Sequence, residues 1–463
     1  MAKEYDSPYR HIAHARSAHR RAVRPGRVIM LGFLAVIVLG TLLLHLPVSA
    51  RSGQMTPLVD CLFTATSATC VTGLVVVDTY QHWTIFGQTV ILCLIQIGGL
   101  GIMSVAAMVS FFTRRTITVR ERLEMSASLS VDDIAGIVRL TKGVILFTFA
   151  VEGVGAALLS LRFIPQFGLW KGIGKSAFHS VSAFCNAGFD LMGEQQEFAN
   201  LSGYATDLLV NVVVVALVVM GGLGFLVWND LAHHRRWHQL SVHTRLVLVT
   251  TAILLAGGSV LLFCLEGTNP ETMGGMTVGQ RAVASLFQAT TCRTAGFNTI
   301  DQQAMTDSSV MVSMLLMFIG GSPGSTAGGI KTTSAAMLVL AAVNVLRGRR
   351  DIAVFRRRID SRTVLHALTV CMVAVMLVFI GTLLLCACDG IAVERALYET
   401  VSAFSTTGLS QNLTPILGTA SKLWLVLEMY LGRIGILTLG VAVFSRRVME
   451  PKIRYPEGRV MIG

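Results

Sequence analysis

Long apolar stretches alternate with short polar ones along this chain of 463 residues. The long stretches approach or exceed the roughly 20 residues that cross a bilayer as a helix. They lie at about 28–46, 83–112, 137–163, 205–231, 246–265, 309–346, 364–387 and 422–444. Within each consecutive pair lies a segment too short to cross, at about 57–69, 173–184, 278–291 and 393–404. The pattern predicts a span, a re-entrant half-helix and a second span, four times over.

Each short segment is followed by a polar loop that ends in Gly and a large apolar residue. The loop glycines are Gly73, Gly188, Gly296 and Gly408, at intervals of 115, 108 and 112 residues. A recurrence at near-constant spacing indicates an internal repeat. Six positions before each Gly is a Ser or Thr that we expect to brace the loop by hydrogen bonding: Ser67, Ser182, Thr290 and Ser402.

The composition agrees with a membrane protein. Hydrophobic residues make up 53% of the chain and charged residues 14%, whereas soluble domains carry about 25% charged residues. The net charge of +12 would suggest nucleic acid as a partner on a soluble protein. Here the basic residues gather at the ends of apolar stretches and no soluble domain remains, so nucleic-acid binding is excluded. The nine cysteines imply no disulfide framework, and most are expected to be buried small apolar residues.

The basic residues predict an orientation. Residues 1–27 hold seven Lys and Arg against two acids, and every second span ends in basic residues, such as Arg114-Arg115 and Arg446-Arg447. By the positive-inside rule, both termini and the linkers are cytoplasmic and the glycine loops open outward. The first apolar stretch is longer than a signal-peptide core, so we keep it as the first span.

These features predict an all-α polytopic membrane protein. Four parallel span–pore helix–span repeats, with eight transmembrane helices and four re-entrant half-helices, surround a central pore. The predicted organisation is a cytoplasmic basic tail at 1–27, repeat 1 at 28–115, repeat 2 at 137–236, repeat 3 at 245–350 with an interrupted second span, repeat 4 at 363–447 and a cytoplasmic C-terminal tail at 448–463.

Four glycine loops at membrane depth predict a cation filter. Non-helical backbone is tolerated there only when it is buried in protein or lines a cavity. Gly lets successive carbonyl groups point inward, and a ring of carbonyls replaces the hydration shell of a monovalent cation. The negative C-terminal ends of the half-helices favour the same charge. The predicted ligands are backbone carbonyls of Val71, Thr72, Gly73, Asn186, Ala187, Gly188, Thr294, Ala295, Gly296, Thr406, Thr407 and Gly408.

The second span of repeat 3 contains a segment that is unsuited to a continuous helix. It reads Gly320, Gly321, Ser322, Pro323, Gly324, Ser325, Thr326, Ala327, Gly328, Gly329, Ile330 and Lys331. It is not a phosphate-binding loop, because the Lys comes one position late and no strand precedes it. Unwound backbone within a membrane must line a cavity, and beneath the filter it would obstruct the pathway. We therefore predict that Gly320–Lys331 is a mobile gate.

The other second spans carry related glycine motifs. Gly98-Gly99-Leu100-Gly101 and Gly221-Gly222-Leu223-Gly224 predict close helix packing. In repeat 4 the motif is Gly432-Arg433-Ile434-Gly435. A charge inside the membrane is costly, so Arg433 is expected to face the pathway as part of the gate, or else to form a salt bridge with Glu428 or Glu152.

Arg293 lies three positions before Gly296, where a cation pointing into a cation filter would be repelled. We expect Arg293 behind the filter, paired with an acid such as Glu399 or Asp301.

The motifs Thr294-Ala295-Gly296-Phe297-Asn298 and Ser402–Leu409, with one filter Gly per repeat, resemble the Trk/Ktr/HKT superfamily of potassium transporters. The resemblance covers residues 28–447. Four repeats without extra spans before the first, and the ending Met461-Ile462-Gly463, are most similar to the bacterial Ktr membrane subunit. Members with Ser at the first filter Gly tend toward sodium, so Gly73 places this chain with the potassium group.

The resemblance implies potassium uptake across the bacterial plasma (inner) membrane, with the 320–331 loop as an intramembrane gate. It also implies a homodimeric membrane unit in contact with lipid and a cytoplasmic nucleotide-binding (RCK-type) ring as partner. No covalent cofactor is expected; potassium is the transported ion and the only metal, and sodium activation is left open, as is the choice between channel and coupled carrier.

Two alternatives remain. One is a sodium-coupled or sodium-permeable carrier of the same superfamily. The other is a membrane-embedded thiol enzyme with Cys70, Cys185 and His179 near one external cavity. The sequence contains no acid/base dyad, nucleophile triad or metal cluster, and the polar groups of that cavity occupy equivalent positions in the repeats. Both observations favour a pore over an enzyme, which needs one asymmetric cluster.

Overall fold

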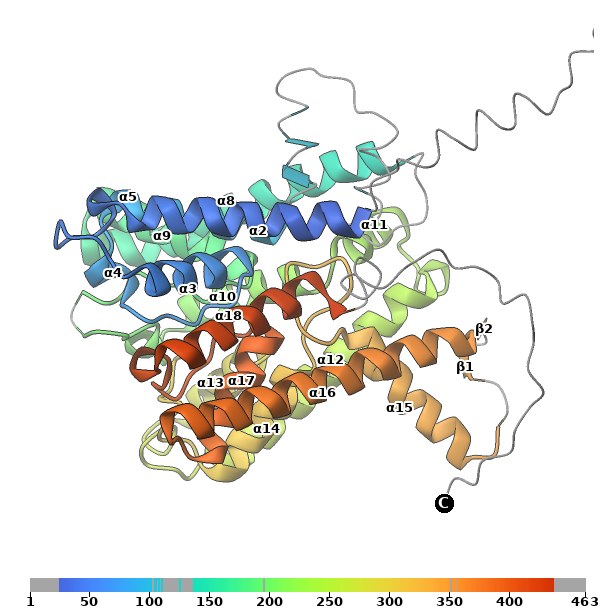
Figure 1. The fold of residues 1–463 in the computed structure, drawn as a ribbon. Helices are drawn as coiled ribbons and strands as arrows, with labels where there is room; N and C mark the ends of the chain where they lie inside the picture. Colours follow the sequence, from blue (N-terminus) through green and yellow to red (C-terminus); the bar gives the residue numbers. More distant parts are fainter. Residues whose placement is uncertain are drawn as a thin grey trace, which may run out of the picture.

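The computed structural model describes residues 25–101, six positions between 104 and 125, and then 136–194, 196–349, 352–355 and 357–436 (Figure 1). Several sequence predictions concern residues outside these ranges. They are most of the basic N-terminal tail, the basic pairs Arg114-Arg115 and Arg446-Arg447, and the C-terminal tail at 448–463.

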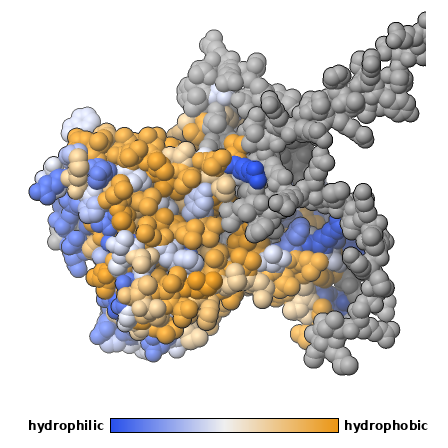
Figure 2. All heavy atoms as spheres, viewed as in Figure 1, coloured by the Kyte–Doolittle hydropathy of each residue, from blue (hydrophilic) through white to orange (hydrophobic). Residues whose placement is uncertain are grey.

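Four helices of the described chain are long and apolar enough to cross a membrane. They are α2 (Pro25–His45), α8 (Ile137–Phe167), α12 (Val242–Glu266) and α16 (Ser361–Asp389). Each begins one group of helices, and large apolar side chains such as Leu39, Leu161 and Phe379 are exposed on them. Figure 2 shows a broad hydrophobic band across the middle of this face, with hydrophilic side chains along its left edge and others at the right. Such a surface is suited to a bilayer.

A short helix follows each long one and packs against it. These short helices are α3 (Leu58–Thr69), α9 (Leu169–Phe184), α13 (Val278–Thr291) and α17 (Val393–Ser405), close to the predicted half-helices. Local sequence sets their starts: Pro57 precedes α3, and Thr277 and Gln280 form a capping box at α13. Their C-terminal ends lead into the glycine turns.

The second helices are interrupted at their glycine motifs, whereas the sequence predicts one span for each of the stretches 83–112, 205–231 and 422–444. Helix α5 (Ile85–Leu100) ends at Gly101 and α18 (Thr419–Ile434) at Gly435, with φ of 80° and 88°. Helices α10 (Leu208–Gly222) and α11 (Phe225–His233) meet at a bend of 92° beside Gly224, whose φ is 95°. The last Gly of each motif adopts a positive φ that ordinary residues resist, and this interrupts the helix.

The predicted interruption in repeat 3 is confirmed. Helix α14 (Asp307–Phe318) and helix α15 (Thr332–Leu346) flank a segment without helix. It contains Gly320–Lys331, which is called the gate loop below after its predicted role. Ile319 and Ile330 form an isolated parallel bridge that brings the two ends of the loop together.

The remaining elements are short. They are η2 (Pro47–Ser49), α4 (Thr79–His82), η3 (Ser202–Tyr204), η4 (Trp237–Gln239), η5 (Thr414–Ile416), β1 (Ala353–Val354) and β2 (Arg357–Arg358). The antiparallel hairpin of β1 and β2 lies in the basic linker before α16 and was not predicted by the all-α interpretation. The described chain is otherwise helical.

The fourth group closes onto the first. Helix α18 packs against α3, and blue and red helices lie together in Figure 1. Lys422 Nζ donates to Asp60 Oδ1 at 2.8 Å, and the Tyr430 hydroxyl donates to the Met30 carbonyl at 2.8 Å. The helix groups are thus arranged in a closed order, with α2, α3 and α5 beside α16, α17 and α18.

Candidate functional site

The four glycine turns, defined as residues 71–73, 186–188, 294–296 and 406–408, share one unusual backbone geometry. In each, both the glycine and the residue two before it have a positive φ. The values are 58° and 98° for Val71 and Gly73, 60° and 70° for Asn186 and Gly188, 66° and 78° for Thr294 and Gly296, and 54° and 93° for Thr406 and Gly408. A left-handed β-branched residue is a genuine outlier. Its recurrence at equivalent positions indicates a functional constraint.

The glycine turns contact one another in cyclic order. A Cβ added to Gly73 would lie 2.5 Å from the carbonyl oxygen of Ala187, and one on Gly188 would lie 2.8 Å from that of Ala295. Likewise, a Cβ on Gly296 would lie 2.5 Å from the Thr407 oxygen, and one on Gly408 would meet the Thr72 oxygen. Each turn therefore touches the next, and the fourth touches the first. Only glycine fits this ring.

Hydroxyl groups brace three turns at the predicted positions. Ser67 Oγ accepts from the Gly73 amide at 3.1 Å, and Ser402 Oγ accepts from the Gly408 amide at 3.0 Å. Ser182 Oγ donates to the Phe189 carbonyl at 2.7 Å. These bonds tie the end of each short helix to the backbone at or beside its glycine.

In the third turn the predicted brace, Thr290, is wrong. Its hydroxyl bonds to the Leu286 carbonyl, and Thr291 Oγ1 instead donates to the Phe297 carbonyl at 2.5 Å. The C-cap of α13, Cys292, lies four residues before Gly296, whereas the C-caps Cys70 and Cys185 lie three residues before their glycines.

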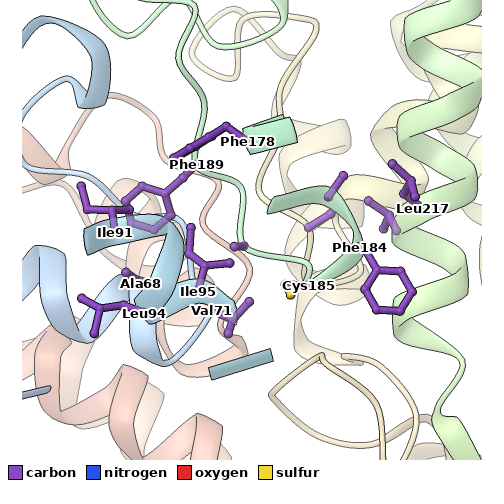
Figure 3. Close-up of a cluster of buried hydrophobic side chains, with 14 of the residues drawn as sticks. Ala68, Val71, Ile91, Leu94, Ile95, Phe178, Phe184, Cys185, Phe189 and Leu217 are labelled. Carbon is purple, nitrogen blue, oxygen red and sulfur yellow. The ribbon is translucent and has the colours of Figure 1, made fainter. Parts of the chain in front are cut away.

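Apolar packing holds the first two turns in place. Figure 3 shows Val71 and Cys185 within a buried cluster that also contains Ile91, Ile95 and Phe189. Interiors packed at this density leave little freedom for a loop to change shape.

The predicted close packing of the second-span glycines is confirmed, and its partner is the end of a short helix. A Cβ on Gly98 would meet the Thr69 carbonyl, and one on Gly221 would meet the Phe184 carbonyl. A Cβ on Gly432 would meet the Phe404 carbonyl in the same way. Each of these carbonyls lies four residues before a filter glycine, so the second helices press directly on the base of the glycine turns.

The gate loop lies against the glycine turns on the side of the preceding short helices. Thr326 Oγ1 donates to the Phe184 carbonyl at 3.3 Å, and the Ser322 amide donates to the Gly222 carbonyl at 3.0 Å. On the opposite side of the ring, a Cβ on Gly328 would meet the Thr406 side chain. The loop therefore reaches from the second helix group to the fourth and passes the third, where Gly320 approaches Thr294.

Arg433 binds the gate loop rather than an acid. Its Nη1 donates to the Thr326 carbonyl, and its Nη2 donates to the Gly98 carbonyl. The predicted alternatives, ion pairs with Glu428 or Glu152, are wrong, because those carboxylates accept from Trp424 and Gln96. Arg433 also lines a cavity of about 300 Å³ together with the gate-loop residues Pro323, Gly324 and Lys331.

Arg293 is buried, but its predicted ion pair is wrong as well. Its Nη2 lies 3.5 Å from the Gly320 carbonyl, and its Nε has no partner among the described residues. Glu399 accepts from the hydroxyls of Ser410 and Thr414, and Asp301 accepts from the Gln303 amide. Arg293 thus joins the third glycine turn to the start of the gate loop.

Comparisons with known proteins agree with this geometry. The family described as "TrkH: Cation transport protein" matches residues 10–452. The chain belongs to this family of cation transport proteins. Its fold is similar to the crystal structure of the potassium transporter TrkH from Vibrio parahaemolyticus, with a TM-score of 0.72, 18% identity, and coverage of 92% of this chain and 86% of that one.

Two curated relatives cover nearly the whole of this TrkH-family chain. It is 41% identical to the Ktr system potassium uptake protein B of Bacillus subtilis, over 95% of this chain and 97% of the relative. It is 38% identical to the potassium/sodium uptake protein NtpJ of Enterococcus hirae, over 96% of this chain and 98% of the relative.

The structure places the residues of the thiol-enzyme hypothesis where they are buried or bonded to backbone. Cys70, Cys185 and His179 are all buried. Both ring nitrogens of His179 are engaged by backbone, Nδ1 with the Lys175 carbonyl at 2.7 Å and Nε2 with the Leu191 amide at 3.4 Å. His179 is therefore unavailable as the base that would activate a thiol.

A cavity on the far side of the ring from the gate loop contains residues that the sequence interpretation did not single out. It is lined by Gly73, Gly296 and Gly408, and by the residues two after each filter glycine: Val75, Asp190, Asn298 and Ser410. Their constant offset from the glycines was a signal available in the sequence. Beyond them lie Asp78 and Asn200, from the loops that follow.

Proposed function

We propose that this member of the TrkH family takes up potassium across the bacterial plasma membrane. The ion passes through the ring of glycine turns and is coordinated by the backbone carbonyls of residues 71–73, 186–188, 294–296 and 406–408. Entry is driven by the membrane potential, which contributes about 2.3 kcal/mol per charge for each 100 mV.

One observation carries the proposal: each filter glycine contacts the backbone of the next glycine turn, and the last contacts the first. A closed ring of carbonyl groups without charged side chains suits a monovalent cation that must bind and then leave. The potassium in the names of the Bacillus and Enterococcus relatives agrees with such a ring.

The gate is proposed to be the loop Gly320–Lys331 with Arg433. The loop crosses the path beneath the ring, with its backbone bonded to the Gly222 carbonyl on one side and its Thr326 carbonyl bonded by Arg433 on the other. Lys331 Nζ donates to the Ala327 carbonyl at 2.7 Å and closes the loop on itself. Opening requires these few bonds to be exchanged for water.

In the proposed topology the chain crosses the membrane eight times and has four re-entrant helices. Its second spans are broken at their glycine motifs. Both termini lie in the cytoplasm. The functional unit is a homodimer in lipid that associates with a cytoplasmic nucleotide-binding ring of the RCK type. Sodium is an activator to be tested, and no covalent cofactor takes part.

A second candidate function is sodium-permeable or sodium-coupled transport. The Enterococcus relative, named for both potassium and sodium, favours it. The two candidates differ in what the ring accepts, so the ratio of potassium to sodium flux separates them.

The test is flux into proteoliposomes that contain the purified protein, measured with potassium and with sodium. We expect potassium flux to exceed sodium flux, and Gly73→Ser to lower the ratio because the new side chain intrudes on the Ala187 carbonyl. Gly53→Ser is the matched control, since Gly53 also has a positive φ but no neighbouring atom within 4 Å. Absence of potassium flux from folded wild-type protein overturns the proposal, and equal sodium flux favours the second candidate.

A further inference from the structure

The residues two positions after the filter glycines form an outer ring around the entrance to the glycine turns. Val75, Asp190, Asn298 and Ser410 all line the same outer cavity, although they come from four distant parts of the chain. Asp190 is the one charged member of this outer ring. An acid at one of four equivalent positions breaks the repeat pattern at the point where a cation would enter.

Only one oxygen of the Asp190 carboxylate accepts a hydrogen bond from the described residues. Its Oδ1 accepts from the Met192 amide at 2.8 Å, and its Oδ2 accepts from none of the described residues. Asp78, the other acid in the cavity, differs. Its Oδ1 accepts from the amides of Tyr80 and Gln81, and its Oδ2 from that of Phe198 at 2.8 Å. Asp78 thus organises backbone, while Asp190 keeps an oxygen for a ligand.

Lys175 is the positive charge that acts on Asp190, and it is shared with Glu194 and the Phe167 ring. Lys175, from α9, is 3% exposed; its Nζ donates to Glu194 Oε2 at 2.9 Å and lies 3.6 Å from the centre of the Phe167 ring. His179, also from α9, has both ring nitrogens engaged by backbone. Asp78 adds a second negative charge from the loop before α4. The glycine turns opposite contribute Asn298 and Ser410, which are neutral and can accept or donate.

We propose that Asp190 forms an outer cation site, where a potassium ion waits before it enters the ring of glycine turns. This inference rests on the proposed function, because it assigns the entrance of the same path. A partly buried carboxylate beside a narrow entrance raises the local concentration of cations without coordinating the ion inside the ring. The ion then leaves the Asp190 oxygen and is coordinated by the backbone oxygens of the glycine turns.

The experiment is rubidium tracer uptake into potassium-uptake-deficient bacteria that express the full chain, with KM and maximal rate measured separately. Asp190→Asn keeps the acceptor for the Met192 amide, so it is expected to fold and to raise KM roughly tenfold with little change in maximal rate. Asp301→Asn is the matched control, since Asp301 accepts from the Gln303 amide in the same kind of turn but is exposed outside the cavity.

Each outcome decides the inference. An Asp190→Asn variant with the wild-type KM overturns it. If Asp190→Asn fails to reach the membrane, Asp190→Glu replaces it: retention of the low KM supports the site, and its loss despite normal expression contradicts a purely electrostatic role. Absence of uptake by the wild type would instead count against the proposed function.

Discussion

Arg433 donates a hydrogen bond through Nη1 to the backbone carbonyl of Thr326, at the middle of the gate loop. Through Nη2 it also donates to the Gly98 carbonyl at the end of α5. One guanidinium thus links the fourth helix group to the first and to the loop that crosses beneath the glycine turns. Its planar fork suits two carbonyls at once, and bonds with an ionised donor are stronger than neutral ones.

Arg433→Ala is expected to raise potassium flux by roughly tenfold, because removing a bond from a charged donor costs the closed loop about 1.5–3 kcal/mol. The measurement is potassium flux into proteoliposomes at matched protein density. Arg433→Lys retains the charge but lacks the fork, so an intermediate flux is expected. A flux identical to the wild type in both variants would show that Arg433 does not hold the gate.

Deleting Ser325, Thr326 and Ala327 is expected to raise flux further, because it removes the carbonyl that Arg433 binds and the hydroxyl that donates to Phe184. The deletion shortens a loop rather than a helix, so the protein should elute as a single species in detergent. Cation flux in proteoliposomes is again the readout. Unchanged or lower flux from a well-folded deletion protein contradicts the gating role.

Gly98→Ala is expected to destabilise the protein by about 1–3 kcal/mol, the usual cost of overpacking a close contact. The added Cβ would meet the Thr69 carbonyl, which cannot move without shifting the first glycine turn. Thermal unfolding in detergent measures the loss. Gly257→Ala in α12 has no neighbouring atom within 4 Å and should be neutral or slightly stabilising. Equal melting temperatures for the two variants would refute the contact.

Converting Cys70 and Cys185 to Ser is expected to leave potassium uptake in place, because transport through backbone carbonyls needs no thiol. Cys185 Sγ lies 3.8 Å from Glu152 Oε1, so a hydroxyl has an acceptor there. The measurement is growth of potassium-uptake-deficient bacteria at limiting potassium. Loss of growth with normal membrane expression would revive the thiol-enzyme alternative.

The positions of the short helices and glycine turns could be predicted because their signals are local and repeated four times. A polar loop with Gly between two apolar stretches leaves few other structures at membrane depth. The breaks at Gly101, Gly224 and Gly435 were missed for the opposite reason. A helix tolerates a glycine, and only the neighbouring helices decide whether that glycine adopts a positive φ.

The partners of Arg293 and Arg433 could not be predicted from charge. Both side chains bind backbone carbonyls that helix ends and the gate loop leave unsatisfied, at Gly98, Thr326 and Gly320. A sequence shows where acids occur, but it does not show which carbonyls lack an amide donor.

The contact between Gly408 and Gly73 has a consequence for biosynthesis. These glycines belong to the last and first turns of the ring, so the ring cannot close until the fourth helix group has been translated and inserted, and has docked on α3 through Lys422 and Asp60. Contacts so distant in sequence form late, because the intervening chain must be ordered first. A partly synthesised chain therefore has no selective path, and the membrane is exposed to conduction only by the finished protein.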